Sequence, residues 1–271
     1  MKSFKISYLL LITCLFFSCE EEMVMIPDFV IPNTGRVVLV EELTGVNCPN
    51  CPAGASQLET IVDFFEGSVV VVGIHGDQLT QPVTGSAYDF RTEASKDIES
   101  SFTFFGKPSA VINRNKNGED RPWGFLIPQW NTEITKEVEK PQEVEIVISK
   151  TYDQTTRELT VNVAAAALVD LERSLHLTVL LTEDNIIDAQ KDTDEIIPDY
   201  KHKHVLRAML SDNSLGDLVS SGLQANESVL KNYTFTLPAE DGTWVAENIN
   251  IVAHVRDDNV VLQAAEVHLL D

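Results

Sequence analysis

Hydrophobic residues repeat with two different periods along this chain, and the change of period falls near residue 141. Continuous apolar runs at 36–43 and 68–75 predict buried strands. Between them, apolar residues recur with the spacing of one helix face, and Gly67 marks the end of that helix; the residues are Leu58, Ile61, Val62 and Phe65. A strand, a helix and a second strand in this order predict a parallel sheet covered on both faces.

Two more helices are predicted before residue 141, one with Phe90, Ala94 and Ile98 and one with Trp130, Ile134 and Val138. Between them, residues 104–114 predict a third strand, and Asn117-Gly118 is typical of a hairpin turn. Lys140-Pro141 ends the last helix. The pattern therefore predicts an α/β domain over residues 35–140.

From residue 142 onward the apolar residues alternate with polar ones, which predicts strands around 144–148, 159–163, 175–181, 233–237 and 249–255. Several such strands with turns between them favour an all-β immunoglobulin-like sandwich over residues 141–271. Asp258-Asn259 predicts the turn of a final hairpin. The irregular acidic stretch 184–228 interrupts the strands, and we expect it to be a long excursion with some helix.

The first 18 residues have a different composition from the rest. Two lysines precede an apolar run at 8–17 that is too short to span a bilayer, which predicts a secretory signal. The run ends in Ser-Cys followed by three glutamates, and this resembles a bacterial lipoprotein signal that is cleaved before Cys19 and diacylated there. We expect a signal peptide at 1–18 and an acidic tether at 19–34, with an ordinary cleavable signal as the alternative.

Composition limits the classes of partner. An apolar fraction of 44% supports packed cores. The formal net charge of −22 argues against nucleic acid and anionic lipid surfaces as partners, because both demand positive charge. We therefore expect contact with a membrane only through the lipid anchor.

The four cysteines are Cys14, Cys19, Cys48 and Cys51, and only the last two are free of the signal and the anchor. Export would place this pair in an oxidising compartment, where a thiol pair is usually a disulfide. The pair lies between a predicted strand and a predicted helix, whose N-terminal N–H groups and partial positive charge would stabilise the Cys48 thiolate. Pro49 has a fixed φ suited to a helix start, and Cys51, one turn deeper, could resolve a mixed disulfide on Cys48.

Two other uses of the pair stay open. A structural staple is a weak explanation, because so short a loop gives only about 2 kcal/mol, against ~3 kcal/mol for a loop of 15 residues. A zinc site needs four ligands, and the chain has no second cysteine pair. We favour redox use of Cys48 and Cys51, with no cofactor.

The run 42–48 resembles, without a gap, the thioredoxin segment in which a buried acid precedes the nucleophile by six residues, and 106–109 resembles the loop with the cis-proline. The resemblance covers roughly residues 36–140. It implies that Glu42 shuttles the proton of the resolving thiol and that Pro108 packs against the disulfide and guards the peptide groove. Asn47 and Lys107 depart from the pattern, where a tryptophan and an apolar residue or threonine are usual.

A closer resemblance spans nearly the whole chain. The lipoprotein signal, the VLVEELTG-x-x-CPNCPAG block, and the segments 200–208 and 261–269 together look like the outer membrane protein 28-related lipoproteins. This implies a location at the outer membrane, on its periplasmic face or at the cell surface. The family is defined by location and sequence, so it adds little to the mechanism.

Five polar residues besides the cysteines could have a functional or only a structural role. Neighbouring strand residues point to opposite faces, so one of Glu41 and Glu42 faces the core side, and we favour Glu42. His75 ends the second strand on the same sheet edge as Cys48 and could tune its thiolate, although a loop histidine without that role is the simpler interpretation. His202 and His204 would share a strand face and could bind a metal, but we favour a structural role.

Two functional hypotheses follow. The first is a lipid-anchored thiol–disulfide oxidoreductase that acts on extracytoplasmic protein thiols or disulfides, with Cys48 attacking, Cys51 resolving, Glu42 accepting a proton and Pro108 guarding the groove. The second is a surface-exposed binding or adhesion lipoprotein in which the thioredoxin-like unit is only a scaffold.

Overall fold

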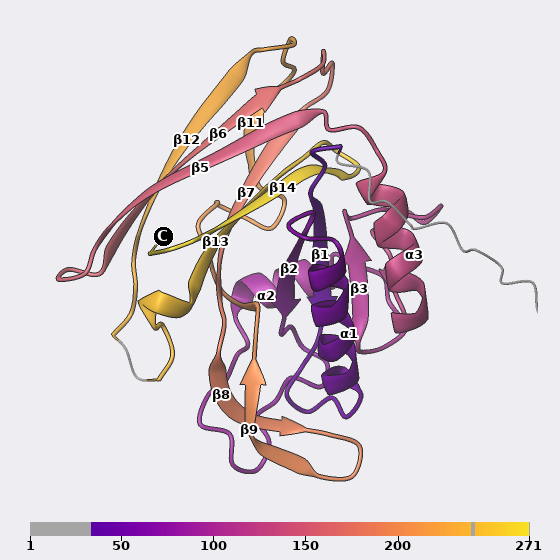
Figure 1. Ribbon diagram of the computed structural model, residues 1–271, viewed down its shortest axis with the longest axis vertical. Coiled ribbons are helices and arrows are strands. Elements are labelled where there is room, and N and C mark those ends of the chain that lie inside the picture. Colours follow the sequence, from indigo (N-terminus) through magenta and orange to yellow (C-terminus); the bar gives the residue numbers. More distant parts are fainter. Residues whose placement is uncertain (1–33, 240–241, 271) are drawn as a thin grey trace, which may run out of the picture. The chain divides into compact units, whose positions relative to one another are not determined.

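The computed structural model describes residues 34–239 and 242–270 (Figure 1). The predicted signal peptide, Cys19 and the tether up to residue 33 lie outside the described residues. Within the described ranges, no helix combines the length and the apolar character needed to cross a membrane. The described chain is mostly β-sheet, with α-helices confined to its first third and to the residues just before 141.

The strand–helix–strand order predicted for residues 36–75 is observed. Strands β1 (Val38–Leu43) and β2 (Val69–Ile74) pair in parallel, and α1 (Cys51–Phe64) connects them. Strand β3 (Ser109–Ile112) adds antiparallel to β1, and the short β4 (Gly124–Phe125) adds to β3, as the hairpin turn at Asn117-Gly118 predicts.

Helices cover both faces of these strands. On one face, α1 and α3 (Ile127–Val138) lie side by side over β1 and β3, as Figure 1 shows, and they share a core with side chains such as Val40 and Trp130. On the other face, α2 (Glu93–Ser100) packs with Ile98 against Leu39. Helices α1 and α3 end close to the predicted positions. The prediction that Phe90 belongs to α2 is wrong, because the Thr92 side chain caps that helix and it begins at Glu93.

A β-sandwich accounts for most of the rest of the chain. One antiparallel sheet contains β5 (Val144–Asp153), β6 (Glu158–Ala167) and β12 (Ser228–Thr236). It packs against β7 (Leu175–Glu183), β11 (Asp217–Ser220), β13 (Ile249–Arg256) and β14 (Val261–His268), with a short 3-10 helix at Ala246–Asn248. The final hairpin, β13–β14, turns where Asp258-Asn259 predicts. The finer immunoglobulin-like assignment stays a prediction.

The expectation of helix in residues 184–228 is wrong. Every regular element described there is a strand: β8 (Ile186–Lys191), β9 (Ile196–His202), β10 (Val205–Met209) and β11. Strands β8 and β9 form an antiparallel hairpin with a two-stranded sheet of its own. The physical reason is tertiary pairing, because β10 and β11 both complete their hydrogen bonds on the distant strand β7.

Strand β10 also joins the two predicted domains. It pairs antiparallel with β7 and in parallel with β2 through Val205 and Gly73, so one sheet runs from the sandwich into the strands near residue 40. The Gly73 amide donates to the His204 carbonyl at 2.7 Å, and a Cβ on Gly73 would lie 3.1 Å from that oxygen, so the close approach favours glycine. A shared core below this sheet contains Val72, Leu180 and Val252. The boundary at 140/141 stays a prediction.

Candidate functional site

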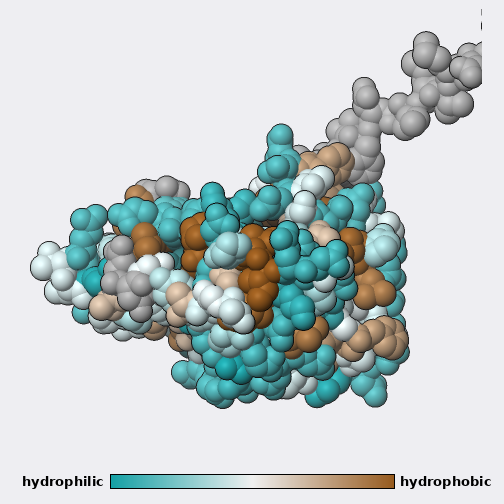
Figure 2. All heavy atoms as spheres, turned by 90° about the horizontal axis from the view of Figure 1, so that it is seen from below, coloured by the Kyte–Doolittle hydropathy of each residue, from teal (hydrophilic) through white to brown (hydrophobic). Residues whose placement is uncertain are grey.

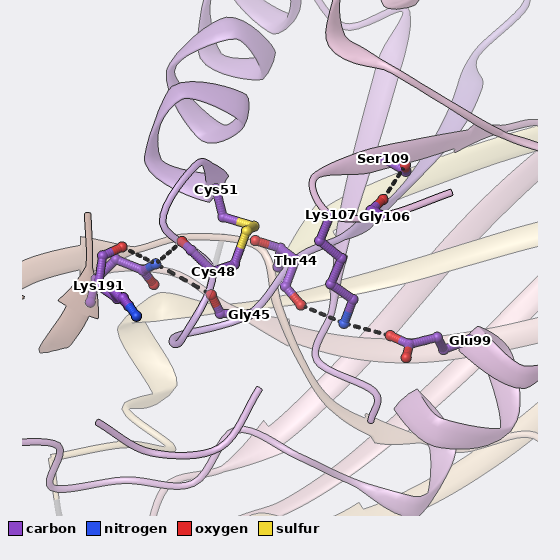
Figure 3. Close-up of a disulfide and its surroundings, with 10 residues drawn as sticks. Thr44, Gly45, Cys48, Cys51, Glu99, Gly106, Lys107, Ser109 and Lys191 are labelled. Atoms are coloured by element: carbon purple, nitrogen blue, oxygen red, sulfur yellow. Dashed lines mark hydrogen bonds and ion pairs between the residues drawn. A yellow bond between two sulfur atoms is a disulfide. The ribbon is translucent and has the colours of Figure 1, made fainter. Parts of the chain in front are cut away.

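The two cysteines at the start of α1 form a disulfide. Cys48 and Cys51 are bonded with their Cα atoms 5.4 Å apart (Figure 3). Helix α1 begins at Cys51 with Asn50 as its N-cap, so the proline of the first turn is Pro52. Pro49 therefore lies just before the helix, in a turn where the Cys51 amide donates to the Cys48 carbonyl at 3.3 Å.

The disulfide is closed off from solvent. Cys48 is 0% exposed and Cys51 is 2% exposed. Part of the cover is the β8–β9 hairpin, because the Gln190 side-chain amide donates to the carbonyl of Cys48 at 3.1 Å. The Lys191 amide donates to the Val46 carbonyl at 2.8 Å, next to the same turn. No local pattern in the sequence predicts this cover, because residues 190 and 48 are far apart in the chain.

Pro108 lies against the start of α1. The Lys107–Pro108 peptide bond is cis, as the resemblance to the thioredoxin loop implies. A Cβ added to Gly54 would lie 2.9 Å from both Cβ and Cγ of Pro108, so the proline ring occupies the space that a side chain at position 54 would need. The Ser109 hydroxyl donates to the Gly106 carbonyl at 2.6 Å within the same loop.

Lys107 is buried beside the proline, and its ammonium has two close partners. Its ammonium donates to the Thr44 carbonyl at 2.8 Å and lies 2.6 Å from the Glu99 carboxylate (Figure 3). Glu99 also accepts from the amides of Asp77 and Gln78. Burial lowers the pKa of Lys107, and the bond to Glu99 opposes that effect. The ion pair thus connects the cis-proline loop, the end of β1 and α2.

Glu42 is buried, as favoured from the sequence, and so is Glu41, because both sheet faces are covered. Glu41 is neutralised by Arg114, whose guanidinium makes two bonds to it at 2.6 and 2.9 Å. Within the described residues, Oε1 of Glu42 has no hydrogen-bond partner. Burial raises the pKa of Glu42 to about 8, although the Lys107 ammonium opposes the rise. Glu42 is therefore mainly a neutral carboxylic acid at pH 7.

A narrow cavity is lined by this acid and by Cys51. Glu42, Cys51, His75 and His202 are among its lining residues, and its volume of about 30 Å³ is enough for one or two water molecules. The Glu42 carboxyl and Cys51 therefore border the same small cavity.

His75 and His202 belong to a buried aromatic cluster, together with Phe90. The His202 ring centroid lies 4.8 Å from that of Phe90 and 6.4 Å from that of His75. Burial, and then the neighbouring His202, lower the pKa of His75 to about 3. Burial lowers the pKa of His202 to about 4, and Asp188 opposes the shift. Both rings are therefore neutral at pH 7, and His75 lies buried in the loop that follows β2.

His202 and His204 do not share a strand face. His202 ends β9, whereas His204 follows with a left-handed φ of 54° and donates its amide to Asp184 at 2.6 Å. Among the residues with described positions, no group of three or more histidine, cysteine, aspartate or glutamate side chains could hold a metal ion.

The face shown in Figure 2 is mainly hydrophilic, with hydrophobic residues in separate areas. This agrees with the 42 acidic residues of the chain, against 20 lysines and arginines. The result is an acidic protein whose Cys48–Cys51 disulfide is buried.

Comparison with known proteins gives one family and a shared fold. The model of the family described as outer membrane protein Omp28 matches residues 95–269, which is more than half of the chain. No curated protein sequence matches the chain. HBP35 of Porphyromonas gingivalis is similar in structure with a TM-score of 0.67 and 16% identity, over 86% of this chain and 75% of that one. A protein of Agrobacterium tumefaciens is similar with a TM-score of 0.52 and 13% identity, over 86% of this chain and 94% of that one. At these identities, the similarity shows the fold alone.

Proposed function

Because the chain belongs to the Omp28 family of outer membrane proteins, we propose that it is a thiol–disulfide oxidoreductase of the outer membrane that works with the Cys48–Cys51 pair. The observation that carries this proposal is the meeting of the disulfide, cis-Pro108 and the buried Glu42 at the first turn of α1. A structural staple would need neither the acid nor the proline. The proposal includes a thioredoxin-like unit over residues 35–140.

The location defines the partners. The family is one of outer membrane proteins, and the chain is assigned to that membrane. Attachment through a diacylated Cys19 is part of the proposal, as are extracytoplasmic protein thiols or disulfides as substrates. The net charge of −22 supports attachment by lipid rather than by contact with anionic headgroups, and it argues against nucleic acid.

The chemistry in the oxidised form starts with a substrate dithiol. One substrate thiolate attacks the Cys48 sulfur, the Cys48–Cys51 bond breaks, and Cys51 leaves as a thiolate that takes the proton of neutral Glu42. The second substrate thiolate then attacks the substrate sulfur of the mixed disulfide, and Cys48 leaves. The substrate dithiol has lost two electrons to the cysteine pair. In the reverse direction, Glu42 accepts the proton of Cys51 while the dithiol reduces a substrate disulfide.

The test uses the full chain with two matched variants. The Cys51→Ala variant keeps the attacking sulfur but cannot resolve, so it should accumulate a mixed disulfide with a protein disulfide such as insulin. The Cys48→Ala variant should form none, and wild type should catalyse exchange of insulin disulfides. If wild type and Cys48→Ala give the same exchange rate, and Cys51→Ala traps nothing, the proposal is wrong.

A binding or adhesion protein on a redox-enzyme scaffold is the second candidate, and the complete burial of Cys48 favours it. Its test is saturable binding of the full chain to matrix proteins or glycans. Binding that is unchanged in Cys48→Ala, together with no disulfide exchange, would support this candidate against the first.

A further inference from the structure

We propose that the β8–β9 hairpin is a closed cover over the Cys48–Cys51 disulfide, and that it must undock before a thiol can reach either sulfur. This regulation of the site rests on the proposed function for its biological meaning. The proposal itself concerns only how accessible one disulfide is to a reagent, and this accessibility can be measured without any enzymatic activity.

The first strand of the hairpin is docked on the loop that carries Cys48. Besides its bond to the Cys48 carbonyl, the Gln190 side-chain amide lies 3.3 Å from the Gly45 carbonyl, and Gln190 is only 3% exposed. The Lys191 amide donates to the Val46 carbonyl. Three carbonyls of this one loop, those of Gly45, Val46 and Cys48, therefore have donors from the hairpin.

A second anchor fixes the same strand to the segment between β2 and α2. The two carboxylate oxygens of Asp188 accept from the amides of Ala87 and Tyr88 at 2.8 and 3.0 Å. Asp188 is 4% exposed. A buried carboxylate that accepts two backbone N–H groups is a strong, directional contact, so it determines where the hairpin lies.

The second strand of the hairpin closes the cavity behind the disulfide. Tyr200 and His202 line it on one side, whereas Cys51 and Glu42 line it on the other. His202 also packs against the ring of Phe90, outside the hairpin. The hairpin therefore contributes to both the burial of the sulfurs and the burial of the acid.

The β8–β9 hairpin can undock as one unit. Strands β8 and β9 hydrogen-bond only with each other in their sheet, and an isolated two-stranded hairpin is marginally stable in water. Its two ends are marked by Asn185 and His204, both with left-handed φ angles, at 58° and 54°. The hairpin is thus held by its docking contacts and not by the main sheet.

Chemistry requires such a motion. Thiol–disulfide exchange needs a thiolate to approach a sulfur along the axis of the bond that breaks, and a residue with 0% exposure offers no such approach. With the hairpin docked, the pair is protected; with it undocked, the loop carbonyls and the sulfurs are free to meet a substrate.

The experiment measures reduction of the disulfide in the full chain by a water-soluble phosphine, which becomes the phosphine oxide, with oxygen from water, as both sulfurs become thiols. The Gln190→Ala variant should be reduced at least fivefold faster than wild type, because two docking bonds are lost. The matched control, Gln224→Ala on an exposed loop, should be reduced at the wild-type rate.

A second measurement keeps the test decisive if a variant is poorly folded. Hydrogen exchange of the Lys191 amide, which bonds to Val46, reports undocking directly, and Gln190→Ala should lose Lys191 protection by the same factor by which its reduction accelerates. Faster Lys191 exchange without faster reduction would overturn the proposal, as would equal reduction rates for Gln190→Ala and wild type. None of these results depends on insulin exchange, so the proposed function and the cover can fail separately.

Discussion

The buried acid at position 42 makes stability depend on pH in a predictable direction. The pKa of Glu42 is raised from 4.5 to about 8 in the folded protein, mainly by burial. Between those values, the folded protein holds a proton that the unfolded chain has released, so raising the pH favours unfolding. Each pH unit corresponds to ~1.4 kcal/mol, which gives a loss of about 3 to 4 kcal/mol between pH 5 and pH 8.

The Glu42→Gln variant isolates this effect, because the neutral amide keeps the size of the protonated acid. The free energy of unfolding is measured by urea denaturation of the oxidised protein at four values between pH 5 and pH 8. The difference, variant minus wild type, should grow by about 3 to 4 kcal/mol across this range. His75 and His202 add an opposite slope below pH 6.5, since both stay neutral in the folded protein, but they do so in both proteins.

Glu59→Gln is the matched control, because Glu59 lines the mouth of the same cavity and is half exposed in a surface pair with Lys203. The free energy of unfolding of Glu59→Gln should stay within about 1 kcal/mol of the wild-type value at every pH. If the wild-type and Glu42→Gln curves run parallel, the acid is ionised in the folded protein and the assignment of a neutral proton donor is wrong.

Three other changes have definite expected outcomes. Gly54→Ala should lower the free energy of unfolding by about 1–3 kcal/mol in urea denaturation, because its Cβ would press on Pro108, whereas alanine at an open helix position would stabilise by up to ~1 kcal/mol. Glu41→Gln should cost about 3 kcal/mol or more in the same assay, because it removes the negative charge that compensates a buried guanidinium; a loss below 1 kcal/mol would contradict the buried pair. Lys107→Met should raise the pKa of Glu42 further, because the Lys107 ammonium opposes the rise that burial causes. NMR titration of the Glu42 carboxyl measures this pKa, and an unchanged or lower value would refute the electrostatic contact.

Local periodicity predicts elements well where each element's own residues determine its packing. The runs at 36–43 and 68–75 became β1 and β2, and the alternation from 144 onward became the strands of the sandwich. Glu42 and cis-Pro108 could be placed only through the resemblance to a known motif, and both positions agree with it in burial and in peptide geometry.

What periodicity could not predict depends on partners far away in the chain. Nothing near Val205 indicates that its neighbour is Gly73, and nothing near Gln190 indicates that its amide bonds to Cys48. The ion pair of Glu41 with Arg114 likewise joins residues 73 positions apart. Such contacts form only when distant parts of the chain pack together, so the pattern within ten or fifteen neighbouring residues does not predict them.

The shared strand β10 has a consequence for how this protein can vary. Because β10 completes hydrogen bonds for both β7 and β2, a break at 140/141 would strip β2 of a neighbour and open the core around Leu180 to water. Transfer of the cysteine-bearing half to another protein by gene fusion would therefore require a new partner strand for β2 in place of β10. The two halves share strand pairing and a core, so a substitution in one half has to be compatible with the packing of the other.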